Sequence, residues 1–324
     1  MRFPLSQLPK GFVLSKPISQ DNYDEAEIYK LEKEGRLVIT RKYDGWKIIA
    51  VIGKRGKVQL YTAGLNEIDA RLDHIKKELR SLKLPPNTVL VGEGCMKNVD
   101  GKDNIGKTIS VFQGSLEKSL KFQAEWGNIQ LIIFDILILN GSFEIGTMKE
   151  KIDMVRGWCV HPNLAWFIMS PFVLNTSFDK AKRIVVENGW EGLVLYDNNF
   201  QHIFRLDGRA PKRPSGCYKW KPILEDDFII RDFVVTDNNP EKFKEVILLQ
   251  IDPVTKREFE FGRLGTFNKE TRARLVKRIY PFVMQVAFDM RFPKSGKIRN
   301  ARFVRIREDK PIHECLAPRS YNPQ

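Results

Sequence analysis

Arg41-Lys42-Tyr43-Asp44-Gly45 is the stretch of sequence from which we predict the fold. Apolar residues precede it at 37–39, and a second apolar run follows it at 47–52. Both runs have the length and β-branched content of strands, so the five residues are expected to join two neighbouring strands. Taken alone, a K-x-D-G tetrapeptide predicts no more than a β-turn that carries a surface lysine.

The segments on either side of this stretch predict a sheet-rich domain with helices on its faces. One helix is expected from the spacing of four apolar residues, namely Ile68, Leu72, Ile75 and Leu79. Further strands are expected at 58–61, 88–91, 129–139, 192–196 and 217–221, and helices at 149–158 and 178–188. Pro222 breaks this pattern, so we place a domain boundary there and predict domains at 1–222 and 223–324.

The second domain is expected to be a small β-barrel. Short strands recur at 228–235, 246–251, 282–288 and 303–306, with one helix at 268–279. This mixture suits a closed barrel of the OB type, and a β-sandwich fits the same pattern. The predicted fold class is therefore α+β, with antiparallel sheets and flanking helices followed by a C-terminal OB-fold barrel.

The charge of the chain predicts a polyanionic partner. Its 324 residues carry a formal net charge of +14. Between Arg205 and Lys310 we count 25 basic and 15 acidic residues, so this third of the chain carries +10 of that excess. Such a field favours nucleic acid, although the total alone also fits a membrane surface or a basic soluble protein.

Targeting and redox features point to the cell interior. No apolar stretch approaches the roughly 20 residues that span a bilayer, and the first six residues lack the apolar core of a signal peptide. The four cysteines are far apart and form no CxxC pair, so we expect free thiols rather than a disulfide framework or a zinc site. We therefore predict a cytoplasmic protein, or a nuclear one if the source is eukaryotic.

Four further motifs follow the K-x-D-G stretch in order: Gly92-Glu93-Gly94, Phe134-Asp135-Ile136-Leu137, Glu191-Gly192-Leu193-Val194 and Tyr218-Lys219-Trp220-Lys221. The ordered series resembles the covalent nucleotidyltransferase superfamily of DNA ligases, RNA ligases and messenger-RNA capping enzymes. Near the C-terminus, the run Arg302-Phe303-Val304-Arg305-Ile306-Arg307-Glu308-Asp309-Lys310 resembles the terminal motif of ATP-dependent DNA ligases. The resemblance covers about residues 36 to 310 and matches a minimal two-domain form of that family.

The resemblance implies that Lys42 is a nucleophile that captures AMP from ATP. A lysine attacks phosphorus only as the neutral amine, so its pKa must be depressed by burial or by neighbouring cations. Lys219 and Lys221 alternate on one predicted strand and project to one face. We expect these two lysines to lower the pKa of Lys42, to contact the α-phosphate and to share the catalytic role.

The other nucleotide contacts also follow from the resemblance. Glu93 would hydrogen-bond the ribose, Phe134 would stack on adenine, and Glu191 would hold the divalent cation. The remaining expected contacts to the nucleotide come from Thr40, Arg41 and Lys47, together with Lys219 and Lys221. The plainer alternatives are that Phe134 is a core residue and that both glutamates are turn or cap carboxylates.

The C-terminal cations Arg302, Arg305, Arg307 and Lys310 are expected to contact nucleic acid or pyrophosphate, although a charged edge strand is the simpler alternative. Two departures from the family bear on nick binding. Lys47 stands where DNA ligases usually carry arginine, which loses bidentate geometry, and the arginine expected near Ala63 is absent.

These observations predict an ATP-dependent DNA ligase that seals nicks with 5′-phosphate and 3′-hydroxyl ends through lysyl-AMP and adenylylated DNA. The expected cofactors are ATP and Mg²⁺, with Mn²⁺ as a substitute, and the expected partner of the monomeric protein is nicked double-stranded DNA. The alternatives are an RNA ligase or an RNA-capping guanylyltransferase. A non-catalytic OB protein that binds nucleic acid would explain the charge but not Lys42, Glu93, Glu191 and the paired lysines.

Overall fold

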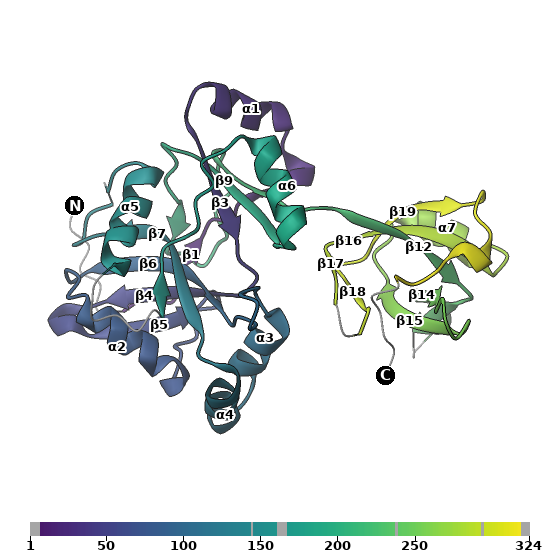
Figure 1. Cartoon of the computed structure of the whole chain (residues 1–324), viewed down its shortest axis with the longest axis horizontal. Helices are drawn as coiled ribbons and strands as arrows, with labels where there is room; N and C mark the ends of the chain where they lie inside the picture. Colours follow the sequence, from purple (N-terminus) through teal and green to yellow (C-terminus); the bar gives the residue numbers. More distant parts are fainter. Residues whose placement is uncertain (1–6, 144, 161–166, 237–238, 293–294, 319–324) are drawn as a thin grey trace. The chain divides into compact units, whose positions relative to one another are not determined.

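The computed structural model of the chain describes residues 7–143, 145–160, 167–236, 239–292 and 295–318. The chain divides into two units, Met1–Lys221 and Pro222–Gln324, each with its own hydrophobic core. Figure 1 shows the order of their elements along the chain. The two units are described one at a time.

Two sheets form the centre of the first unit. The larger has the strand order β5-β4-β6-β7-β8, and the smaller has the order β2-β11-β9-β3. The strands of the larger sheet are β4 (Trp46–Ile52), β5 (Val58–Thr62), β6 (Thr88–Cys95), β7 (Gln130–Ile138) and β8 (Ile168–Met169). Those of the smaller sheet are β2 (Ile18–Ser19), β3 (Leu37–Lys42), β9 (Gly192–Asp197) and β11 (Cys217–Trp220). A separate ribbon pairs β1 (Val13–Leu14) with β10 (Phe204–Arg205).

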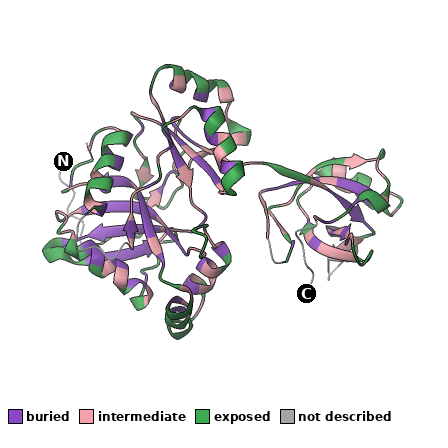
Figure 2. Ribbon diagram, in the orientation of Figure 1, coloured by how far each residue is buried: buried purple, intermediate pink, exposed green. Residues whose placement is uncertain are grey.

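Helices pack on both sheets of the first unit. Leu72, Ile75 and Leu79 of the α2 region, Val111 of α3 and Val155 of α5 share a core with the larger sheet, whereas α1 and α6 pack on the smaller one. Figure 2 shows that buried residues gather on the strands and exposed residues on the outer sides of the helices. The helices are α1 (Glu25–Lys33), α2 (Asp73–Ser81), α3 (Ile105–Gln113), α4 (Leu116–Trp126), α5 (Met148–Cys159) and α6 (Phe178–Asn188). Short 3₁₀ turns lie at η1 (Gln20–Asn22), η2 (Lys54–Gly56) and η3 (Ala70–Leu72).

Local sequence explains where several helices begin. Ser, Thr, Asp or Asn side chains accept a hydrogen bond from the first helical turn at α1, α3, α4, α5 and α6, and Thr147 forms a full capping box with Glu150 at α5. The helix predicted from Ile68 onward is shorter than expected. It begins at Asp73 because residues 70–72 form a 3₁₀ turn, although all four predicted apolar residues are buried.

The second face of each sheet carries charged side chains of the motifs. Along β4 and β6, Ile48 and Leu90 point into the helix-covered core, so Lys47 and Glu93 point the other way. Along β3 the side chain of Ile39 packs toward α1 and α6, so Lys42 lies on the opposite face. The second face of the larger sheet therefore carries Lys47 and Glu93, and the second face of the smaller sheet carries Lys42.

The second unit is built on a mainly antiparallel sheet with the order β13-β14-β12-β16-β19, and β15 pairs with β14. Among the described residues, no strand pairing closes this sheet into the barrel that the sequence predicted. Its elements are β12 (Leu224–Ile230), β13 (Phe233–Thr236), β14 (Asn239–Ile251), β15 (Glu258–Leu264), α7 (Lys269–Val276), β16 (Phe282–Phe288), β17 (Met290–Arg291), β18 (Ile298–Arg299), β19 (Arg302–Arg307) and the 3₁₀ turn η4 (Ile312–Glu314).

Two further predictions concern the chain as a whole. All four cysteines are free thiols, as the sequence predicted, and all four are buried. Within the described residues, every helix is too short or too polar to cross a bilayer.

Candidate active site

The Arg41–Gly45 stretch connects the two sheets, because Lys42 is the last residue of β3 and Trp46 is the first residue of β4. Gly45 is required by a close approach to β6. A Cβ atom at this position would lie 2.5 Å from both the Sγ atom of Cys95 and the carbonyl oxygen of Gly94. The glycine of the K-x-D-G motif therefore lets the turn pack directly against the strand that carries Glu93.

Glu191 holds two lysines at the end of the smaller sheet. Its Oε2 atom accepts a hydrogen bond from Nζ of Lys42 at 2.5 Å, and its Oε1 atom lies 2.9 Å from Nζ of Lys221. The carboxylate is 12% exposed, and the two lysine side chains are 23% and 21% exposed. Lys42 pairs with Gly192 across β3 and β9, and a side chain at Gly192 would overlap the carbonyl oxygen of Trp220. The strand register therefore brings Lys42 and Glu191 together.

The pKa of Lys42 moves in the direction opposite to our expectation. Burial is the largest influence and lowers it, but attraction to Glu191, Glu93 and Asp44 outweighs burial, so the pKa of Lys42 is raised. Burial opposes the charge of Glu191, yet its two lysine partners hold the pKa of this carboxyl low. The predicted depression of the pKa of Lys42 is therefore wrong, because carboxylates are its immediate neighbours.

Lys47 and Glu93 lie directly opposite each other on β4 and β6. Burial lowers the pKa of Lys47, while burial raises the pKa of Glu93 to about 7 against the pull of Lys42 and Lys47. Phe134 lies in a bulge of β7, and Nζ of Lys47 is 6.0 Å from the centroid of its ring. The larger sheet therefore contributes a carboxyl, an amine and an aromatic ring to the same site.

The remaining predicted residues of the first unit divide between two faces. Lys219 lies near Lys42 and Lys221, and burial together with these cations lowers its pKa. Thr40 is buried on β3, and its hydroxyl donates to the carbonyl oxygen of Val194 at 3.3 Å. Arg41 is not brought into this cluster, because its guanidinium binds Asp103 at 3.0 Å on the other face of β3.

The comparisons with known proteins agree with this arrangement of motifs. A family model described as the ATP dependent DNA ligase domain matches residues 20–221, which is more than half of the chain. The chain belongs to the ATP-dependent DNA ligase family. It is therefore a polynucleotide ligase, and its family uses ATP. No curated protein sequence matches it.

Solved structures share the fold of this ligase at low sequence identity. One, described as "Pmar-Lig_Pre.", has a TM-score of 0.66 at 20% identity, with 92% of this chain and 68% of that chain covered. Another comes from a study described as "DNA binding with a minimal scaffold: Structure-function analysis of Lig E DNA ligases". It has a TM-score of 0.62 at 16% identity and covers 91% of this chain and 99% of that chain.

A buried polar network of the ligase lies beside Phe134, and the sequence analysis missed its role. Nζ of Lys151 is 3.1 Å from Oδ1 of Asp135 and donates to Oε1 of Gln201 at 2.7 Å. Nε2 of His202 is 3.4 Å from the other oxygen of Asp135. The sequence did contain a sign of this network. Lys151 falls among the apolar positions 148, 152 and 155 of α5 and therefore lies on the buried face of the helix.

In the second unit of the ligase, the C-terminal cations have carboxylate or amide partners. Asp227 binds both Arg307, at 3.0 Å, and Lys310, at 2.8 Å, while Arg305 donates to Gln285 at 2.7 Å. Arg302 lies 2.6 Å from Asp289. A bulge in β19 lets Phe303 and Ile306 both pack on the core while the arginines remain outside.

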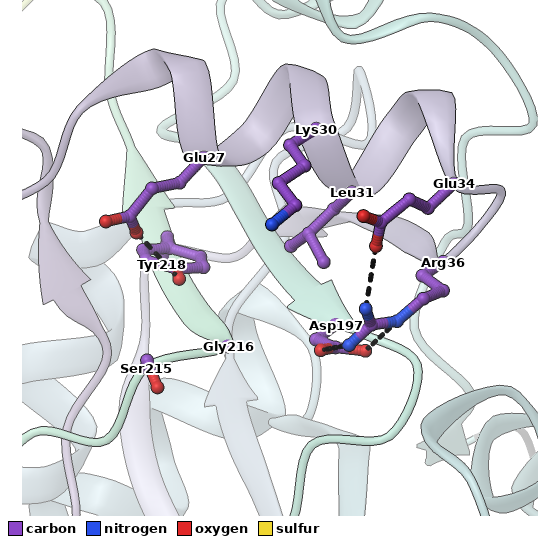
Figure 3. A pocket seen from close by; sticks show the side chains of 9 residues that line it. All are labelled: Glu27, Lys30, Leu31, Glu34, Arg36, Asp197, Ser215, Gly216 and Tyr218. Atoms are coloured by element: carbon purple, nitrogen blue, oxygen red, sulfur yellow. Dashed lines mark hydrogen bonds and ion pairs between the residues drawn. The ribbon is translucent and has the colours of Figure 1, made fainter.

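A cavity of about 300 Å³ in the ligase lies away from these groups (Figure 3). Helix α1 forms one wall, and Lys30 of this helix points into the hollow. Tyr218 lines it and packs with the core under α1 and α6, whereas Lys219, the next residue on β11, points to the opposite face. The cavity is therefore separate from the cluster around Lys42.

Proposed function

We propose that this ligase seals nicks in duplex DNA through a covalent lysyl-AMP at Lys42. The observation that carries the proposal is that Glu191 forms ion pairs with both Lys42 and Lys221, at the point where the turn joins the two sheets. Lys42 is the amine in this cluster that is held next to both Glu93 and Glu191 by the K-x-D-G turn. A nucleotide bound at the sheet faces that carry Lys42 and Glu93 would place its α-phosphate among these lysines.

In the first step, Nζ of Lys42 forms a bond to the α-phosphorus of ATP. The bond from this phosphorus to the bridging oxygen of the β-phosphate breaks, pyrophosphate leaves with the electron pair, and the amine releases a proton. Because Lys42 is paired with Glu191 and its pKa is raised, this ion pair has to weaken before attack. Lys219 and Lys221 contribute positive charge where the phosphoryl oxygens gain negative charge.

Two further displacements complete the reaction. A 5′-phosphate oxygen at the nick attacks the same phosphorus, the phosphorus–nitrogen bond breaks, and Lys42 regains its amine. The 3′-hydroxyl then attacks the 5′-phosphorus, AMP leaves, and a phosphodiester forms with release of the hydroxyl proton. In the lysyl-AMP intermediate, Glu93 holds the ribose and Phe134 holds the adenine. Thr40 and Lys47 lie beside the nucleotide.

The carboxylate at Glu191 also suits a divalent cation. Among the described residues, no group of three or more His, Cys, Asp or Glu side chains could hold a metal. Mg²⁺ in nucleotide enzymes commonly takes one or two carboxylates and completes its shell with phosphate oxygens and water, so Glu191 alone fits this pattern. Mg²⁺, or Mn²⁺ in its place, would supply neutralisation of phosphate charge.

The second unit is proposed to be an OB-fold domain that binds the DNA backbone. Its antiparallel sheet and its exposed cations Arg302 and Arg305 support this reading. The substrate we propose is a nicked double-stranded DNA bound by a monomer. The arginines and lysines then contact phosphates and carry no sequence preference.

Sealing of labelled substrates tests the proposal. The protein is mixed with Mg²⁺, either ATP or GTP, and a duplex that has one nick with a labelled 5′-phosphate, prepared with DNA or RNA strands. We expect ATP-dependent conversion of the DNA label into a phosphatase-resistant form. Sealing of RNA alone would contradict the DNA ligase assignment in favour of an RNA ligase. In a parallel reaction, labelling of the protein by α-labelled GTP but not by α-labelled ATP would contradict it in favour of a guanylyltransferase.

A further inference from the structure

Asp103 binds three donors next to the Arg41–Gly45 turn. It lies in the loop between β6 and α3, and its side chain is 6% exposed. Its Oδ2 atom lies 3.0 Å from the guanidinium of Arg41 and accepts a hydrogen bond from the backbone N–H of Asp44 at 3.1 Å. Its Oδ1 atom accepts a hydrogen bond from Nζ of Lys97. Two of these contacts are to residues on either side of Lys42.

Arg41 in turn connects the nucleophile to its partner carboxylate. Its guanidinium carbon lies 4.8 Å from the ring centroids of both Tyr43 and Trp190. Trp190 directly precedes Glu191, as Arg41 directly precedes Lys42. The pair of residues ahead of the catalytic ion pair is therefore stacked on one face of the sheet, while the ion pair itself lies on the other.

Arg41 depends on Asp103 for its charge balance. The arginine side chain is only 11% exposed, and its Nε atom is buried without a hydrogen-bond partner. A guanidinium that loses its carboxylate in such a setting is expected to move toward water, because an unpaired buried charge is strongly unfavourable. Movement of Arg41 would release the stack on Trp190 and with it the placement of Glu191 next to Lys42.

We propose that Asp103 is a positioning residue that sets the geometry of Lys42 for attack, an inference that rests on the proposed function of Lys42. Asp103 belongs to the larger sheet through its loop after β6, whereas Lys42 and Glu191 belong to the smaller sheet. Its contacts with Arg41 and Asp44 therefore fix the joint between the sheets at the reacting amine. A displacement of about 1 Å at such a joint can cost on the order of 100-fold in rate.

The test compares Asp103→Asn with wild type in single-turnover transfer of AMP from α-labelled ATP to the protein. The asparagine has the same shape and keeps an oxygen for the Asp44 N–H, but it removes the charge that holds Arg41 and Lys97. We expect the rate at saturating ATP to fall by about 10-fold to 100-fold, while the ATP concentration for half-maximal rate changes by less than about twofold. A loss confined to ATP affinity would overturn the inference.

Asp197→Asn is the matched control. Asp197 binds Arg36 at the opposite end of the β3–β9 ladder, where it pairs with Leu37, so this variant removes a similar ion pair far from Lys42. We expect this variant to keep the wild-type rate per folded molecule, whatever its stability. Equal losses of the rate per folded molecule in both variants would show that the loss of any such ion pair slows the reaction, and would overturn the inference.

Two outcomes separate this inference from the proposed function. If wild type accepts no label, or if Lys42→Ala still accepts it, the proposed function fails. If wild type is labelled at Lys42 and folded Asp103→Asn reacts within about twofold of wild type at saturating ATP, the positioning role fails. If Asp103→Asn does not fold, the test uses Arg41→Gln, which removes one of the three donors. Its rate of AMP transfer at saturating ATP is then compared with wild type in the same way.

Discussion

At Lys42, burial and charge act in opposite directions on one amine, and charge prevails. The residue is held as an ammonium by Glu191, with Glu93 and Asp44 adding to the attraction. If Lys42 is the nucleophile we propose, this ion pair holds the amine in place, and the pair has to weaken before the amine can attack.

Gly45→Ala should damage the site through packing alone. The added Cβ would meet Cys95 and Gly94 at 2.5 Å, so the turn has to move away from β6, at a cost of about 1–3 kcal/mol. AMP transfer to Lys42 should slow at least 10-fold, which α-labelled ATP would measure. Gly64→Ala, whose nearest neighbours would be 3.8 Å away, is the control, and equal rates in the two variants would contradict the packing argument.

His202 should make the first unit sensitive to acid. Burial lowers its pKa to about 4, against the pull of Asp135, whereas an unfolded histidine titrates near 6.5. Between these values only the unfolded chain takes up the proton, so the free energy of unfolding falls as pH falls from 6.5 to 4, by at most about 3 kcal/mol.

Urea unfolding followed by tryptophan fluorescence measures this loss, because all six tryptophans precede Pro222 and report on the first unit. His202→Gln should lose less stability than wild type between pH 7 and pH 4.5. The same pH dependence in both proteins would rule out His202 as the responsible group.

At the scale of elements, the sequence predicted those helices and strands whose bounds are marked by short periodic patterns. Helix α6 and strand β16 were predicted with their observed bounds, because apolar spacing and a serine cap mark the helix and a dense apolar run marks the strand. Helix α1 was missed because its surface is mainly charged, with Ile28 and Leu31 as its buried residues. β15 was missed because its pattern alternates charged and aromatic residues around Gly262.

The candidate site was predictable to the extent that its residues lie in short motifs. Lys42, Glu93, Phe134, Glu191 and Lys219 were named from such motifs and lie on the facing sides of the two sheets. Asp103 was not predicted, because an aspartate in a polar loop gives no signal until the fold brings it to Arg41. The pKa of Lys42 was predicted with the wrong sign, since the sequence does not show which charges are nearest.

A buried ion pair joins helix α5 to β7 in addition to their apolar contacts. Lys151 is 2% exposed and Asp135 is fully buried, so Lys151→Met leaves a buried carboxylate without its cation. We expect the free energy of unfolding of the first unit to fall by about 3–5 kcal/mol, measured by the same fluorescence in urea. Lys149→Met, on the exposed side of α5, should change it by less than about 0.5 kcal/mol, and a comparable loss there would contradict the role of the pair.

At the scale of the whole molecule, the positive charge is expected to strengthen binding to the phosphates of the DNA backbone. Arg305 is exposed and is held by a neutral amide, so its charge is available to a phosphate. Arg305→Ala should weaken binding to a nicked duplex and reduce the slope of log K against log salt by about 0.9. Binding titrations at several salt concentrations measure this slope. The control is Arg263→Ala, because Arg263 is already bound to Glu245 and Glu260.

An unchanged slope in Arg305→Ala would show that this side chain contacts no phosphate. An equal change in both variants would indicate that only the net charge matters.

The central claim is that Lys42 is the residue that carries AMP. The most direct measurement is covalent transfer of label from α-labelled ATP to wild type, to Lys42→Ala and to Lys149→Ala, followed by mass spectrometry of the labelled peptide. We predict label in wild type and in Lys149→Ala, located on the peptide that contains Lys42, and none in Lys42→Ala. Label retained by Lys42→Ala, or located on another lysine in wild type, would contradict the account.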